Sequence, residues 1–313
     1  LTTETKKKER RQLLADFGDG SLDMLIGTHA VLNDEIVPHN LGMTIIDEEH
    51  KFGVKQKGKL EEYDKAGAHH ISMTATPIPR SIAMAVYSDE LAILPIRTMP
   101  AGRKPIQTSQ CATPDEVFAK MYEEIQKGHQ GYLICPFIED SESDQFQNVM
   151  SISAAKELAE AYFRTTAKSV RIGVISGDMK QKDILDTVQH FADKAFDILI
   201  STTIVEVGVN VPNATVIGIM SADRFGLAAL HQLRGRVGRS SDQGYCLLCS
   251  AVKTERLDIL CQTTDGFVIA EEDMRLRGPG DLAGDAQSGN SEVINLIMQR
   301  PNLTNAIRKR IFA

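Results

Sequence analysis

The sequence predicts an α/β protein with an incomplete α/β unit, a complete α/β unit and a helical tail. Short apolar runs alternate with amphipathic helical patterns, which is typical of a mostly parallel sheet covered by helices. After Val252 the strand pattern stops and helical stretches follow. The 313 residues, 42% of them hydrophobic and 25% charged, are enough for about two ordinary globular domains.

Apolar runs predict the strands of the first unit, residues 1–97. We expect strands at Met24–Gly27, Met43–Ile46, Ile71–Thr74 and Leu91–Ile96, and helices at Gly53–Lys65 and Ser81–Val86. The next stretch, RTMPAGRKP, contains two prolines, one glycine and three basic residues. This composition predicts a linker over residues 98–105.

The second unit, residues 106–252, repeats the alternation. We expect strands at Tyr132–Cys135, Arg171–Ile175, Ile198–Ile200, Val216–Ile219 and Tyr245–Cys249, and helices at Val117–Lys127, Ser153–Phe163 and Lys180–Phe191. In the tail, residues 253–313, helical stretches flank a Gly/Pro turn at Arg277–Gly280, and a short basic helix is expected at Ile307–Ile311.

Charge and cysteine content exclude some classes of protein. A net charge of -7 does not indicate a general nucleic-acid binder, so DNA contact would need local clusters such as Arg234, Arg236 and Arg239. Cys246 and Cys249 have the spacing of half a zinc knuckle, but no second pair completes it, and we expect both in a buried strand. The unpaired cysteines, together with the absence of a secretory signal or an apolar run near 18 residues, predict a cytoplasmic protein without membrane contact.

An acidic motif follows directly after one predicted strand. The run Met43–Ile46 leads into Asp47, Glu48, Glu49 and His50. Acids at the carboxyl edge of a parallel sheet lie where such folds bind ligands. An Asp there can hold Mg²⁺ through water, and a neighbouring Glu can orient or deprotonate an attacking water. A solvated acidic turn is the alternative, and the preceding apolar strand makes it less favoured.

Hydroxyl residues end two further predicted strands. Thr74 and Thr76, in SMTATP, can hydrogen-bond the acidic cluster and a nucleic-acid strand, although such residues are more often helix N-caps. In ISTTIVEVGVNVP, an apolar strand runs into hydroxyls and then into Glu and Gly, a pattern that can bind a phosphate backbone and couple to nucleotide.

The stretch QLRGRVGR is the most informative in the chain. Arg236 and Arg239 are three residues apart, so on a helix they would share a face. Two guanidiniums presented together suit a triphosphate, because each planar group can bind phosphate oxygens in a bidentate manner. Gly235 and Gly238 would let the backbone approach another domain closely. A basic surface helix is the alternative.

The motifs DEEH, TATPIPR, STTIVEVGVNVP and QLRGRVGR, in this order, resemble motifs II, III, V and VI of superfamily 2 helicases, and Gly27-Thr28-His29 resembles motif Ib. The tail sequence RLRGPGD is similar to the translocation motif shared by RecG-type and Mfd-type proteins. His50, Arg224 and His231 favour the RecG type. The resemblance covers almost the whole chain and implies two RecA-like lobes, the first incomplete, followed by a C-terminal helical hairpin.

The resemblance also implies residue roles. Asp47 would hold Mg²⁺, Glu48 would be the catalytic base, and Arg236 and Arg239 would be arginine fingers. Binding of ATP or coupling to it would involve Glu49, His50, Gln232, Gly208 and Asn210. Contacts with DNA would involve Thr28, His29, Thr74, Thr76, Ser201, Thr202 and Thr203. The translocation hairpin would use Arg275, Arg277 and Gln287.

The implied activity is ATP-dependent remodelling of branched DNA and stalled replication forks, in recombination and repair. Its cofactors would be ATP and Mg²⁺. Branched or forked double-stranded DNA would be its partner, with replication-fork proteins as further candidate partners, and the family resemblance implies a monomer.

The sequence departs from the family pattern in three places. The segment GVKQKGK at 53–59 fits G-x-x-x-x-G-K, but Leu60 replaces the required Ser or Thr, so we expect the true P-loop before Leu1, together with the family's wedge domain. We therefore expect this chain alone to hydrolyse no ATP at a useful rate. Asn210 replaces a usual Asp, and Ala286 replaces a usual Arg.

Three alternatives remain open at this point. An Mfd-like translocase would differ by an upstream domain that contacts RNA polymerase. A non-catalytic DNA-binding module derived from a motor would lack a P-loop in its whole reading frame. A metal-dependent hydrolase that used the acidic motif would need further ligands at suitable spacing.

Overall fold

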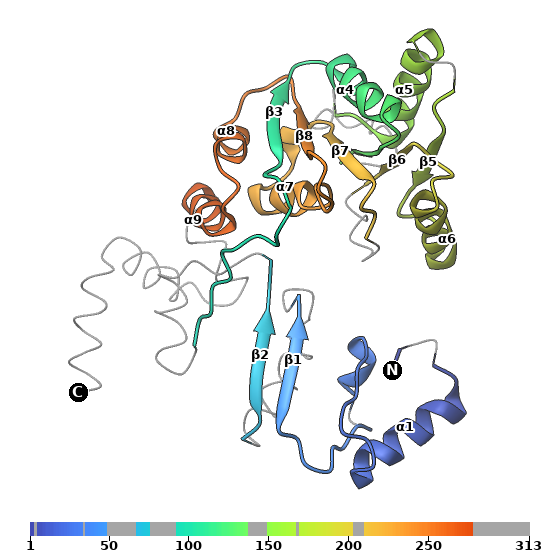
Figure 1. The fold of residues 1–313 in the computed structure, drawn as a ribbon, viewed down its shortest axis with the longest axis vertical. Coiled ribbons are helices and arrows are strands. Elements are labelled where there is room, and N and C mark those ends of the chain that lie inside the picture. The colour runs from blue at the N-terminus through green and yellow to red at the C-terminus, as the bar shows by residue number, and fades with distance from the viewer. Residues whose placement is uncertain are drawn as a thin grey trace, which may run out of the picture. The chain divides into compact units, whose positions relative to one another are not determined.

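The computed structural model describes residues 1–2, 5–33, 35–48, 67–75, 92–136, 149–166, 169–202 and 210–277. The chain divides into two compact units, Leu1–Ala75 and Thr76–Ala313, which are considered separately (Figure 1). No helix among these residues combines the length and the apolar character that crossing a bilayer requires.

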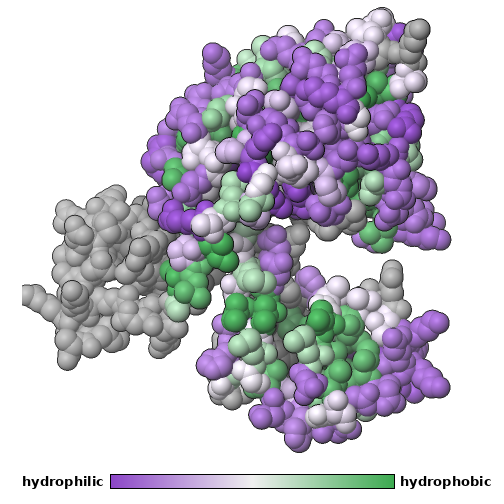
Figure 2. Space-filling model, viewed as in Figure 1, coloured by the Kyte–Doolittle hydropathy of each residue, from purple (hydrophilic) through white to green (hydrophobic). Residues whose placement is uncertain are grey.

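The first unit contains a two-stranded parallel sheet. Strand β1 (Met43–Asp47) pairs with β2 (His69–Met73), and Ile45 lies opposite Ile71. Both predicted strands are confirmed. Strand β2 begins two residues before the predicted start and ends one residue before the predicted end. One face of this sheet exposes the apolar side chains of Met43, Ile45, Ile71 and Met73. Apolar surface on this unit is visible in Figure 2. Parallel sheets normally bury both faces, so an exposed apolar face is unusual for a sheet of this kind.

Two other expectations for this region are wrong. Met24–Gly27 and the described residues 92–96 are irregular rather than extended strands, and Ile26 and Leu94 are 76% and 85% exposed. Neither run has a strand partner among the described residues, and an apolar run without one gains no ladder hydrogen bonds. Helix α1 (Lys7–Asp19) was not predicted. It ends at Gly20, whose φ of 84° is the left-handed conformation that commonly terminates helices.

The second unit is a six-stranded parallel sheet with the order β3-β8-β7-β4-β6-β5 (Figure 1). The α/β class with parallel sheets and flanking helices is therefore confirmed. Its strands are β3 (Gln107–Cys111), β4 (Gln130–Ile134), β5 (Ile172–Ile175), β6 (Ile198–Ser201), β7 (Ala214–Ile219) and β8 (Tyr245–Cys249).

Helices cover both faces of this sheet. On one face lie α4 (Pro114–Gln126) and α5 (Ile152–Thr166), and on the other lie α6 (Gln181–Ala192), α7 (Leu227–Arg234), α8 (Glu255–Gln262) and α9 (Gly266–Arg277). Alternate strand residues supply the two cores: Leu133 packs with α4 and α5, and its neighbours Tyr132 and Ile134 pack on the opposite face.

Local sequence explains how these helices begin. Helix α4 starts with Pro114 at its first position, and Thr113 and Glu116 form a capping box.

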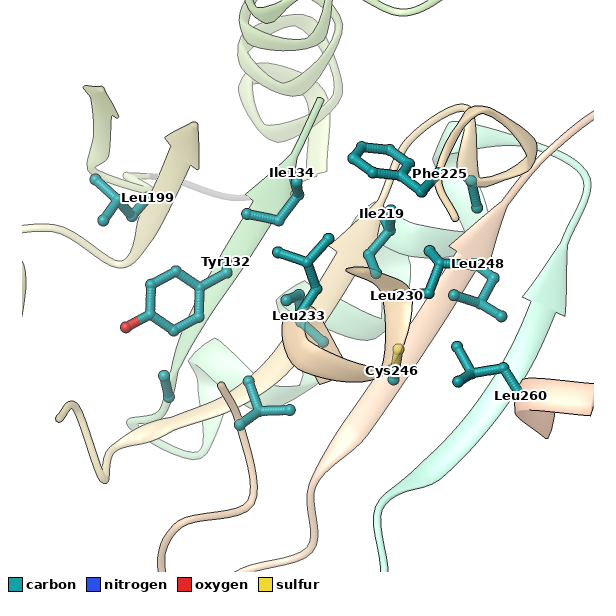
Figure 3. Packing of buried hydrophobic residues seen from close by; sticks show 14 of the residues in the cluster. Tyr132, Ile134, Leu199, Ile219, Phe225, Leu230, Leu233, Cys246, Leu248 and Leu260 are labelled. Atoms are coloured by element: carbon teal, nitrogen blue, oxygen red, sulfur yellow. The ribbon is translucent and has the colours of Figure 1, made fainter. Parts of the chain in front are cut away.

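Helix α7 places Leu230 and Leu233 over the sheet, beside Ile219, Cys246 and Leu248 (Figure 3). Because α7 is buried along this side, the residues just after it are held at a fixed place on the second unit.

Candidate functional site

The acidic motif and the following hydroxyl motif meet at one edge of the first sheet. Asp47 is the last residue of β1 and lies opposite Met73, the last residue of β2. Since the strands are parallel, Glu48 and Thr74 leave the sheet side by side at its carboxyl edge. Asp47 is exposed, and its carboxylate accepts a hydrogen bond of 2.9 Å from the backbone N–H of Glu48.

Glu48 adopts a backbone conformation that is rare for residues with a side chain. Its φ is 54°, in the left-handed region, and such residues are concentrated at functional sites. The turn shields one carboxylate oxygen, Oε2, from solvent. The carboxylates of these two neighbouring residues therefore have different surroundings: that of Asp47 is exposed to solvent, and that of Glu48 is part-buried.

The remaining predicted residues of this unit are exposed where the structure describes them. Thr28 precedes the short 3-10 helix His29–Val31, and Thr28, His29 and Thr74 are all solvent-exposed. Outside the described residues lie Glu49, His50, Thr76 and the helices expected at Gly53–Lys65 and Ser81–Val86, together with the GVKQKGK segment.

The arginine motif does not continue as a helix, which a shared helix face for Arg236 and Arg239 would require. Helix α7 ends at Arg234, and Gly235 caps it. Gly238 has a φ of 68°, a conformation that an α-helix cannot contain. Arg236 and Arg239 therefore lie in the turn that follows α7 and do not share a helix face. The physical reason is the glycine pair, which permits the chain to leave the helix immediately.

The turn holds Arg239 through polar contacts with neutral groups. Its Nε donates to the carbonyl of Gly235 at 3.1 Å, and one terminal nitrogen lies 3.4 Å from Oδ1 of Asn210. Burial lowers the pKa of Arg239 from its usual value, and the positive charge of Arg236 lowers it further. Both arginines also lie near Tyr132 of β4. Burial raises the pKa of the Tyr132 phenol to about 12, although the positive charges of Arg239 and Arg236 act to lower it.

Arg234 has a structural position, which corrects its inclusion in a DNA-contacting cluster. It is only 2% exposed. Its guanidinium donates to the carbonyls of Leu260 at 2.7 Å and Thr263 at 2.9 Å, and it bonds Nδ1 of His231 at 2.9 Å. A guanidinium used in this way joins α7 to α8 and cannot reach a phosphate.

The hydroxyls at the end of β6 are buried. Ser201 is the last residue of that strand and donates its hydroxyl to the carbonyl of Thr202 at 2.9 Å. Thr202 is 6% exposed, and its Oγ1 has no hydrogen-bond partner among the described residues. The DNA contacts predicted for both stay predictions. Gln232 is half-buried on α7, whereas Thr203 and Gly208 lie outside the described residues.

In the tail, Arg275 of α9 pairs with two carboxylates. It lies 2.6 Å from Glu272 on its own helix and also contacts Glu255 of α8. Arg277 is the last residue of α9. Its side chain, Gln287, Ala286 and the helix expected at Ile307–Ile311 lie outside the part that is described, as does the second half of the predicted hairpin.

The cysteine pair lies in a buried strand, as expected. Cys246 and Cys249 are 0% and 6% exposed, on β8. Within the described ranges, no group of three or more His, Cys, Asp or Glu side chains could hold a metal ion. Sequence reasoning assigned no role to Arg103, whose charge reaches Arg239; the signals were its place in the basic segment RTMPAGRKP and the likeness of GRKP to the family's linker.

Three family profiles match the chain in succession. They are the DEAD/DEAH box helicase at residues 1–85, the helicase conserved C-terminal domain at 116–241, and the ATP-dependent DNA helicase RecG, domain 3, C-terminal, at 263–300. The "ATP-dependent DNA helicase RecG" of Staphylococcus epidermidis is 47% identical over 92% of this chain and 42% of its own length. The protein of the same name from Staphylococcus aureus is 45% identical over 95% and 43%.

Solved structures give the same relationship. A RecG structure bound to a three-way DNA junction superposes with a TM-score of 0.69 at 34% identity, covering 97% of this chain and 39% of that one. The Mycobacterium smegmatis helicase Lhr, bound to ssDNA and AMP-PNP, shares the fold at a TM-score of 0.55 and 16% identity, over 88% of this chain and 36% of Lhr. The fold and the ordered motifs therefore define a helicase motor of superfamily 2. Within that class, more than nine tenths of the chain is similar to RecG proteins, and it spans about two fifths of the length of the curated relatives that it matches.

Proposed function

We propose that the protein containing this chain is an ATP-dependent DNA helicase of the RecG type that remodels branched DNA and stalled replication forks. The observation that carries the proposal is the part-exposed turn after α7, where Arg236 and Arg239 stand together and where Arg239 donates its hydrogen bonds within the described residues to neutral groups. Paired guanidiniums of this kind suit a phosphate chain. The likeness to a RecG structure bound to a three-way DNA junction supports branched DNA as the substrate.

The residues of the two motifs are of the types that ATP and Mg²⁺ require. Asp47, exposed at the carboxyl edge of β1, would hold Mg²⁺ through water, since Mg²⁺ prefers oxygen ligands and keeps several waters. Glu48, with one oxygen shielded, would orient or deprotonate the attacking water. Arg236 and Arg239 would neutralise charge that develops on the transferred phosphate. Bound ATP would supply the phosphoryl group whose hydrolysis drives movement.

Other residues would couple this chemistry to DNA. Gln232, half-buried on α7, and Asn210, beside Arg239, lie where they could respond to bound nucleotide. Thr28, His29 and Thr74 are exposed and could donate to DNA phosphates, which proteins commonly contact with hydroxyls as well as with cations. Arg275 would act in the translocation hairpin. The match of the tail to RecG domain 3 favours this type over an Mfd-like translocase.

The decisive test uses the full-length protein that contains this chain. We expect DNA-stimulated ATP hydrolysis and conversion of a model fork into a four-way junction, measured by phosphate release and gel mobility. Glu48→Gln and Arg239→Ala should each lower turnover by about two orders of magnitude or more. Lys182→Ala, a substitution on the exposed surface of α6, is the matched control and should leave turnover unchanged. Absence of DNA-stimulated hydrolysis in the unmodified protein would refute the proposal.

A further inference from the structure

The predicted linker is fixed to the second unit at both ends. At its start, Arg97 lies 3.1 Å from the Asp265 carboxylate and 4.4 Å from the ring centroid of Phe267. The other oxygen of Asp265 accepts the Phe267 N–H at 2.8 Å, so the same carboxylate anchors the beginning of α9. At its end, the Gln243 side chain donates to the carbonyl of Pro105 at 2.7 Å. The loop between these two anchors is therefore held in place.

A tight turn lies between the anchors and carries Arg103. The N–H of Arg103 donates to the carbonyl of Pro100 at 3.3 Å. Gly102 has a φ of 84°, as the third residue of a type II turn requires, and no heavy atom lies near the position of an added Cβ there. Backbone geometry rather than crowding thus accounts for glycine at this position. The turn leaves the Arg103 side chain exposed to solvent.

The end of the loop packs directly on the arginine motif. Ile106 touches Gly238, since a methyl group added to that glycine would lie 2.9 Å from Cγ1 of Ile106. The next residue, Arg239, is therefore close to the loop. The charge of Arg103 is near enough to contribute, after burial and Arg236, to the lowered pKa of Arg239. Three guanidiniums from two distant stretches of sequence are gathered at this place.

Among the described residues, no paired carboxylate neutralises the positive charges of these three arginines. Within the described part of the chain, no ion pair joins Arg103, Arg236 or Arg239 to a carboxylate, and the side chain to which Arg239 donates a hydrogen bond is the neutral Asn210. Like charges in proximity disfavour one another, and a multivalent anion relieves that repulsion. The cluster has the character of an anion-binding site. Its three charges lie near one another, which fits an oligophosphate better than backbone phosphates spread along a DNA helix.

We propose that Arg103 is a third phosphate-binding arginine, which acts with Arg236 and Arg239 on the phosphate chain of a nucleoside triphosphate. This inference rests on the proposed function. Arg97 is then a positioning residue, because its contacts with Asp265 and Phe267 hold the loop that presents Arg103. Arg103 thus reaches the nucleotide site from a loop that is held in place and is not a free hinge.

The experiment compares variants of the full-length protein in DNA-stimulated ATP hydrolysis. Arg103→Ala should lower kcat/KM for ATP by about ten- to a hundredfold, the usual range for one charge-assisted hydrogen bond. Lys104→Ala, at the neighbouring exposed position, is the matched control and should change it less than twofold. Arg97→Ala should cause a smaller loss in kcat/KM, about three- to tenfold. The double variant Arg97→Ala/Arg103→Ala should lose no more than Arg103→Ala alone.

A second readout separates nucleotide from DNA. Binding of a fluorescent, non-hydrolysable ATP analogue should weaken in Arg103→Ala, whereas affinity for a three-way junction without nucleotide should not change. If junction affinity falls and analogue binding does not, Arg103 contacts DNA and the inference is wrong. Equal losses in Arg103→Ala and Lys104→Ala would also overturn it. If the unmodified protein lacks DNA-stimulated hydrolysis, it is the proposed function that fails, before any variant is compared.

Discussion

The guanidinium of Arg234 donates a hydrogen bond of 2.7 Å to the backbone carbonyl of Leu260, which joins the end of α7 to the last turn of α8. A second bond, of 2.9 Å, reaches the carbonyl of Thr263. Carbonyls in the last turn of a helix have no partner within the helix, so this buried arginine supplies donors that α8 would otherwise lack. Its role is to fix the helices that carry the arginine motif.

Replacement of Arg234 by Ala should destabilise the second unit strongly. The substitution leaves one buried and one part-buried carbonyl without these donors and opens a cavity, and we expect it to lower the free energy of unfolding by about 2–4 kcal/mol. Arg236→Ala, only two residues away and part-exposed, should cost no more than about 1 kcal/mol. Urea unfolding of the two variants measures the difference. Similar losses in both would show that Arg234 is not the structural arginine.

His231 should make stability depend on pH. Burial, followed by the charge of Arg234, lowers its pKa to about 4, compared with about 6.5 in an unfolded chain. Between these pH values the unfolded state binds a proton that the folded state does not. Stability should therefore fall as the pH drops from about 6.5 to about 4, and above about pH 6.5 His231 should not affect it. The loss attributable to His231 should be about 3 kcal/mol at most.

The control for His231 keeps its hydrogen bond and removes its titration. Nδ1 of His231 bonds a terminal nitrogen of Arg234 at 2.9 Å, and the amide oxygen of Asn can accept the same bond. His231→Asn should therefore reduce the slope of stability against pH between 4 and 6.5, as determined by urea unfolding at several pH values. An unchanged slope would assign the pH dependence to other groups.

The central strands could be predicted from the sequence because both of their faces are buried. The apolar run Tyr245–Cys249 coincides with β8, which has neighbours on both sides. The edge strand β3, Gln107–Cys111, has the polar sequence QTSQC and pairs with β8 alone, so it lacks the pattern that marks a strand. Its hydrogen bonds come from tertiary structure, which the sequence does not display.

The candidate site could be predicted by residue type but not by geometry. Asp47 ends β1 and Glu48 follows it at the sheet edge as expected, because an apolar strand that runs into acids places them at its carboxyl end. The turn at Gly238 could not be distinguished from a continuing helix, since glycine is tolerated in both. Arg103 was missed for a different reason: only the folded chain brings it near Arg239.

Gly218 should be required by the packing of α4 on β7. A methyl group added there would lie 2.3 Å from Cγ1 of Val117, a fully buried residue. Gly218→Ala should therefore lower the free energy of unfolding by about 1–3 kcal/mol, the usual cost of overpacking a core. The double variant Gly218→Ala/Val117→Ala provides the needed space, so its loss should be smaller than the sum of the two single losses. Strict additivity in urea unfolding would contradict the proposed clash.

Gly238 should be required for catalysis, whereas Gly235, three residues earlier, should tolerate substitution better. Gly238 has a φ of 68° and contacts Ile106, so an Ala there is both strained and crowded, and it should displace Arg239. Gly235 has a φ of -65°, and an added methyl group would approach two backbone oxygens, the nearer at 3.3 Å. In the full-length protein, Gly238→Ala should lower DNA-stimulated ATP turnover by about tenfold or more, because a finger arginine contributes roughly 10³–10⁵ to the rate. Gly235→Ala should lower it several times less. The reverse order of these two variants would show that the turn after α7 does not position Arg239 for the reaction.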